Sequence, residues 1–115
     1  MTRKVLLFCL VLLVPTFMLG QMSGIYVIGT GGSYTTFGTA ANALSNYGVD
    51  GPVTFNVLNG TYDADFTLAT ISGTSETNTV TFQSYSGDAE DVVLTDSYSN
   101  ATYVTRFTGA DYVTF

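Results

Sequence analysis

Residues 50–62 read DGPVTFNVLNGTY, and this stretch decides how the rest of the chain is interpreted. Apolar residues take every second position, the period of a strand with one buried face: Val53, Phe55 and Val57. Gly51-Pro52 precedes the run and Asn59-Gly60 follows it, and both pairs are typical of chain turns. The stretch therefore predicts a short strand between two turns.

The centre of this strand returns later in the chain. The phrase Val-Thr-Phe occurs at 53–55, 80–82 and 113–115, so 27 residues separate the first two copies and 33 the last two. A second alternating pair, Phe66 and Leu68, is followed at a similar interval by Val92 and Leu94. Because recurrence at such intervals is typical of stacked repeats, we expect the Val-Thr-Phe copies to lie on one another. Phe66 over Val92 and Leu68 over Leu94 would form the opposite wall.

One helix is expected outside the N-terminal leader. Apolar residues recur at the spacing of a single helical face, at Phe37, Ala40, Ala41 and Leu44. Thr35 or Thr36 can cap its start and Gly48 can end it, but no Glu or Gln completes a capping box. The resulting fold prediction is all-β: the start of a right-handed parallel β-helix, a solenoid, with one N-terminal capping α-helix. A β-sandwich, which also has many short alternating strands, is the alternative.

The predicted organisation has three parts. Residues 1–20 form a signal peptide, 21–50 the first strand and the capping helix, and 51–115 the first coils of the β-helix. Because the sequence stops within a predicted strand and a solenoid needs about three repeats and a capped end, we expect a fragment truncated at its C-terminus.

The leader predicts export. Arg3 and Lys4 precede an apolar run over 5–14, and the small residue Gly20 follows, which is the layout of a secretory signal. A membrane anchor is the alternative, but the uninterrupted run is shorter than the roughly 20 residues that span a bilayer. We therefore expect a secreted or cell-surface protein with no membrane contact after cleavage.

The composition excludes several functions. The formal net charge is −6, the chain has no His, and Arg106 is the only base after the leader. Nucleic-acid binding needs clustered Lys and Arg side chains, and the chain after the leader has no such cluster. A Ser/His/Asp or Ser/Lys nucleophile needs a His or a Lys as its general base, and neither residue occurs after the leader. The single cysteine, Cys9, lies in the leader, so disulfides and thiolate metal sites are not expected.

Four segments together resemble a known family: Gly29–Phe37 with the Ala-rich helix after it, Gly51–Val57, Asn59–Tyr62 and Gly109–Phe115. They are similar to the N-terminal start of right-handed parallel β-helix (pectin-lyase-like) proteins, above all secreted surface proteins exported by type IX secretion. The resemblance implies a structural role, with downstream coils of the same parent chain as the main partner.

Pectin methylesterases share a similar start and supply the alternative function. In this chain Ala64 replaces the acid of their Gly-x-Tyr-x-Glu phrase, and Ser33 stands where an Asp is usual. The family's catalytic residues come from later coils, so the resemblance implies no catalytic residue here. The alternative is therefore the leading segment of a polysaccharide lyase or pectin-esterase-like enzyme whose active site lies beyond residue 115.

Carboxylates are the main candidates for chemistry. Asp63 and Asp65 could form a paired-acid site, and Asp88, Glu90 and Asp91, with Asp96, could hold Ca²⁺ through oxygen ligands. Solvated turns are the favoured interpretation of both groups. Gly29–Gly32 before the helix suggests a phosphate cradle, but the lysine of that motif is missing, and a turn explains these glycines. No cofactor is expected apart from this calcium possibility.

Tyrosines are the candidates for carbohydrate contact, because their rings offer flat apolar area with a polar tip. The main candidates are Tyr85, Tyr98 and Tyr103, with Tyr34 and Tyr47 as further ones; packing in the core or in turns is the alternative. We therefore expect a non-catalytic structural, adhesive or carbohydrate-contacting protein, with polysaccharide or cell-surface glycans as partners. A complete small sugar-binding domain is a third possibility.

Overall fold

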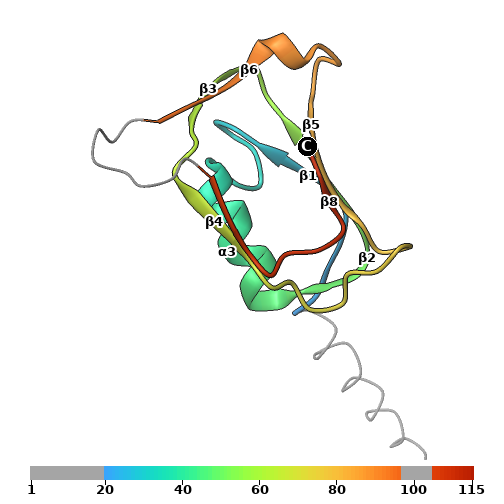
Figure 1. Ribbon diagram of the computed structural model, residues 1–115. Coiled ribbons are helices and arrows are strands. Elements are labelled where there is room, and N and C mark those ends of the chain that lie inside the picture. The colour runs from blue at the N-terminus through green and yellow to red at the C-terminus, as the bar shows by residue number, and fades with distance from the viewer. Residues whose placement is uncertain (1–19, 97–104) are drawn as a thin grey trace, which may run out of the picture.

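The structure, a computed structural model, describes residues 20–96 and 105–115. Its elements in chain order are β1 (Met22–Ile28), α3 (Phe37–Tyr47), β2 (Val49–Val57), β3 (Gly60–Asp63), β4 (Phe66–Ala69), β5 (Val80–Ser84), the 3₁₀ turn η1 (Ala89–Asp91), β6 (Val92–Thr95), β7 (Thr105–Thr108) and β8 (Val113–Thr114) (Figure 1). The predicted signal peptide lies outside the described residues except for Gly20. No helix of the described ranges is long and apolar enough to cross a membrane.

The strands form three parallel sheets around one interior. The largest sheet has the order β1-β2-β5-β8, and the other two pair β3 with β6 and β4 with β7 (Figure 1). Alternate side chains of β2, β4 and β5 point inward and are buried, as their apolar–polar alternation predicts. The buried core thus joins the large sheet to β4, and Tyr62 of β3 and Val92 of β6 are partly buried against it.

The predicted stacking of the Val-Thr-Phe copies is confirmed. Val53 pairs with Val80 and Val80 with Val113, so the three copies lie side by side in register. The ring centroids of Phe55 and Phe82 are 4.8 Å apart, and those of Phe82 and Phe115 are 4.7 Å apart. The apolar side chains of the three copies lie opposite one another on adjacent strands. They fix this register, since a slip of one residue would turn every apolar side chain outward.

The predicted fold class is wrong. The described residues form a small compact globule of parallel sheets with one helix, and a right-handed parallel β-helix solenoid is not found in them. The sheets are unequal, with four, two and two strands. The opposite wall also differs from the prediction, because Phe66 pairs with Thr105 and Leu68 with Phe107, while Val92 pairs with Gly60. Paired strands therefore lie at unequal distances along the chain, whereas a solenoid stacks similar repeats.

The helix was predicted correctly, but its role was not. Helix α3 begins after the N-cap Thr36, ends at Gly48 with φ 70°, and buries the expected apolar face. A capping box is present after all, because Thr39 takes the place of Glu or Gln: its Oγ1 accepts from the Thr36 N–H at 3.3 Å. Phe37 packs its ring against Tyr62, Phe66 and Phe82, so α3 is part of the shared core and not the cap of a stack.

Gly51-Pro52 lies inside β2, although a turn was expected there. The register shifts at this point: Met22 pairs with Val49 and Gly24 with Val53, so β2 has extra residues opposite β1. A bulge of this kind accommodates a proline, which has no N–H for the ladder. Gly24, with φ 94°, supplies the positive backbone angle on the other strand.

Candidate functional site

A groove lies where β5 continues past β8. Strand β8 pairs with Val80 and Thr81 of β5, and the groove lies beside the residues of β5 that follow them. The groove has a volume of about 510 Å³ and is lined by Asn56, Phe82, Gln83, Ser84, Tyr85, Ser86, Gly87, Ala89 and Phe115. Its lining combines amides, hydroxyls and aromatic rings.

Two side-chain amides lie side by side on the outer face of the large sheet. Asn56 and Gln83 are register partners on β2 and β5, and the Gln83 Nε2 donates to the Asn56 Oδ1 at 2.8 Å. This bond uses one donor and one acceptor. The pair still presents the amide N–H groups of Asn56 and the amide oxygen of Gln83 at the groove.

Tyr85 supplies an aromatic surface next to this pair. Its backbone N–H donates to the Val57 carbonyl at 2.8 Å, which fixes the residue at the end of β5. Its side chain is 62% exposed. The turn that follows is held by Ser86, whose Oγ donates to Asp91 Oδ2 at 2.7 Å and accepts from the Asp88 N–H at 3.1 Å. The aromatic ring is therefore exposed while its backbone is held in place.

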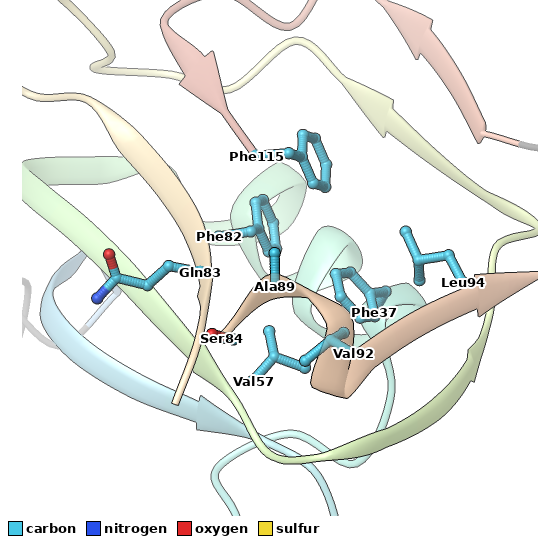
Figure 2. A pocket seen from close by; sticks show the side chains of 9 residues that line it. All are labelled: Phe37, Val57, Phe82, Gln83, Ser84, Ala89, Val92, Leu94 and Phe115. Atoms are coloured by element: carbon cyan, nitrogen blue, oxygen red, sulfur yellow. The ribbon is translucent and has the colours of Figure 1, made fainter. Parts of the chain in front are cut away.

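A second, apolar cavity adjoins the groove. It measures about 200 Å³ and is lined by Phe37, Val57, Phe82, Gln83, Ser84, Ala89, Val92, Leu94 and Phe115 (Figure 2). Figure 2 shows the rings of Phe82 and Phe115 one above the other, with Leu94 across the cavity from them. Phe82 and Phe115 line both hollows, so the cavity and the groove are continuous at these rings.

The predicted tyrosines do not gather at one place. Tyr85 lies at the groove, Tyr47 lies at the end of α3 and is exposed, and Tyr98 and Tyr103 lie outside the described residues. Tyr34 packs instead: its ring centroid is 6.0 Å from those of Tyr26 and Phe55. Burial raises the pKa of Tyr34, and the neighbouring phenols of Tyr26 and Tyr47 add to that rise in pKa.

The acidic candidates hold turns. Asp63 Oδ1 accepts from the backbone N–H of Asp65 at 3.2 Å. Asp88 caps η1 by accepting from the Glu90 N–H at 3.0 Å, and Asp91 accepts from Ser86. Among residues 20–96 and 105–115, no three acidic, His or Cys side chains cluster so as to hold a metal ion. Calcium binding at Asp88, Glu90 and Asp91 stays a prediction to which the geometry adds no support.

The glycine-rich stretch forms a turn that covers β1. The Tyr34 N–H donates to the Val27 carbonyl at 3.1 Å, and the Gly29 N–H donates to the Tyr34 carbonyl at 2.8 Å. The Val27 N–H donates to Ser33 Oγ at 3.3 Å. These bonds give the stretch a structural role at the edge of the large sheet.

Sequence reasoning missed the amide pair. Asn56 directly follows Phe55, and Gln83 directly follows Phe82, so each amide has the same place after a copy of Val-Thr-Phe. Residues at equal places in stacked copies become neighbours on one face. The repeat itself therefore contained the signal for Asn56 and Gln83.

The chain was compared with protein-family models, with curated proteins and with solved structures, and none of the three comparisons finds a match. The resemblance to pectin-lyase-like surface proteins therefore stays a hypothesis based on the sequence.

Proposed function

We propose that the protein is exported and makes non-catalytic, adhesive contacts with carbohydrate through the groove at the end of β5. The observation that carries the proposal is the exposed ring of Tyr85 beside the amide pair of Asn56 and Gln83. An aromatic face suits the apolar side of a sugar ring, and paired amide donors and acceptors suit its hydroxyl groups. The secretory layout of the leader supports a location where such ligands occur.

The charge around the groove narrows the ligand class to neutral oligosaccharides. Asp88, Glu90 and Asp91 follow the groove residues directly along the chain, and the chain carries a formal net charge of −6. Like charges at short range disfavour binding of an acidic chain such as a polyuronate. A neutral hexose or pentose oligomer meets no such repulsion.

Titration calorimetry with neutral hexaoses of glucose, mannose and xylose tests the proposal, with hexagalacturonate as the acidic comparison. We expect one of the neutral oligomers to bind. Tyr85→Ala should weaken its binding about fivefold, because one aromatic contact contributes about 1 kcal/mol. Tyr47→Ala is the matched control, because Tyr47 is 55% exposed but lies outside the groove. Equal losses from both variants, or no heat with any neutral oligomer, would refute the proposal.

A further inference from the structure

A third hollow lies where β2 ends and β3 begins, next to the start of α3. It has a volume of about 360 Å³, which suits a small ligand. Leu58 and Tyr62 supply apolar lining. The polar side chains at the hollow come from the loop before α3, from the turn between β2 and β3, and from β3: Thr30, Thr35, Thr36, Asn59, Thr61 and Asp63. The hollow therefore offers hydroxyl groups, an amide and a carboxylate beside a small apolar area.

The walls of this hollow are held by bonds within the protein. The Tyr62 hydroxyl donates to the Leu58 carbonyl at 2.7 Å, which ties the β2–β3 turn to β3. Thr36 is fixed as the N-cap of α3, and Asp63 Oδ1 accepts from a backbone N–H at 3.2 Å. A Cβ at Gly29 would lie 2.9 Å from the Leu58 Cβ, so the loop before α3 is in close contact with the turn. Polar groups that are already in place lose less entropy when a ligand binds.

The hollow adjoins the groove of Tyr85 at one end of the large sheet. Val57 and Ser84 are register partners on β2 and β5, so Leu58 and Tyr85, which follow them, come next to each other. The Tyr85 N–H, which donates to the Val57 carbonyl, continues this pairing. Because neighbouring strands lie about 4.8 Å apart, a wall residue of the hollow and the aromatic residue of the groove are adjacent.

From this continuity we infer that the hollow is a second sugar subsite, which binds further residues of the same neutral oligosaccharide; the inference rests on the proposed function. The Asp63 carboxylate accepts from sugar hydroxyl groups, and the Asn59 amide and the threonine hydroxyls pair with others. The carboxylate also disfavours an acidic chain, which agrees with the neutral ligand proposed for the groove. Once the groove holds one end of an oligosaccharide, contact with the hollow is intramolecular and adds affinity. The protein therefore selects for chain length.

Titration calorimetry of the whole protein with the disaccharides and hexaoses of glucose, mannose and xylose tests the inference. For the sugar that binds, we expect the hexaose to bind at least about tenfold more tightly than the disaccharide. Asp63→Asn removes the charge but keeps an oxygen for the turn bond, and it should weaken the hexaose about tenfold. Asp50→Asn is the matched control, because Asp50 is an exposed acid of β2 outside both hollows. Urea unfolding checks that both variants fold.

A second variant and a map of the contacts separate the hollow from the groove. Thr61→Val keeps the shape of the side chain but removes its hydroxyl, so it should weaken the hexaose about fivefold. In nuclear magnetic resonance spectra of the labelled protein, the hexaose should shift amide signals of residues 58–63 as well as those of 83–87.

The second subsite and the proposed function fail in different ways. If Tyr85→Ala weakens the hexaose but Asp63→Asn and Thr61→Val do not, the groove remains the sugar site and the second subsite is overturned. Equal affinity of the disaccharide and the hexaose would also overturn the second subsite alone. No heat with any hexaose would refute the carbohydrate function itself, and the inference that rests on it.

Discussion

The aromatic stack of the large sheet allows one side chain to be tested at three degrees of burial. Phe55, Phe82 and Phe115 lie on adjacent strands, with relative exposures of 0%, 4% and 54%. Truncating a fully buried Phe to Ala costs about 3–5 kcal/mol of unfolding free energy, and the cost rises when the site cannot collapse. The three positions should therefore give graded losses of stability.

The surroundings of each ring set the expected values. Phe55 is enclosed, so Phe55→Ala should lower the free energy of unfolding by about 4–5 kcal/mol. Phe82 borders the open cavity of about 200 Å³, whose walls can relax, so Phe82→Ala should cost about 3 kcal/mol. Phe115 buries only about half of its surface, so Phe115→Ala should cost about 1 kcal/mol.

Urea unfolding followed by circular dichroism measures these losses through the midpoint and slope of the transition. If Phe55→Ala does not fold, as is expected of a domain with only about 5–10 kcal/mol of stability, Phe→Leu at the same positions preserves the order with smaller losses. An exposed control on another sheet, Phe107→Ala, should resemble Phe115→Ala. Equal losses at all three positions, or a larger loss at Phe115 than at Phe55, would refute the proposed packing.

Two further predictions concern a helix cap and alkaline stability. Thr36→Ala removes the hydroxyl that accepts from the Thr39 N–H at 3.1 Å, so it should lower the unfolding free energy by about 1 kcal/mol, measured by urea unfolding. Thr35→Ala is the control, because Thr35 is the exposed threonine next to the cap. An equal loss of unfolding free energy in both variants would contradict the assignment of Thr36 as the cap. Burial raises the pKa of Tyr62 and is the main reason for the raised pKa of Tyr34. The folded state therefore favours the neutral form of both phenols. Their contribution to the free energy of unfolding is fully present below the ordinary pKa of 10.0 and should be lost as the pH rises above it. Tyr62→Phe should reduce this loss of stability at high pH, measured by urea unfolding at pH values on either side of 10.0. At neutral pH the same variant should lower the free energy of unfolding by about 1 kcal/mol, because the hydrogen bond of 2.7 Å from the Tyr62 hydroxyl to the Leu58 carbonyl is lost. An unchanged alkaline loss in Tyr62→Phe would contradict the role of this phenol.

The sequence by itself determined the features that depend on near neighbours. Alternation located β2 and β5, and the 3.6-residue period located α3. Gly48 marked the end of the helix, whereas its start was narrowed only to Thr35 or Thr36. The repeated Val-Thr-Phe phrase gave the register of β2, β5 and β8, because identical apolar patterns align best without a slip. Within these segments, each residue's role follows from its own type and from the few residues next to it.

Only the tertiary structure decided which strands meet in the two smaller sheets and how the core closes. The sequence-based choice of Val92 as partner of Phe66 was wrong, since Phe66 pairs with Thr105 and Val92 with Gly60. Loop length changes the free energy of closure only slowly, so spacing along the chain discriminates weakly between such partners. The ring of Phe37, which contacts three strands, joins α3 to the interior and closes a compact core. The partners of that ring come from distant parts of the chain, and their contacts exist only once the sheets have assembled.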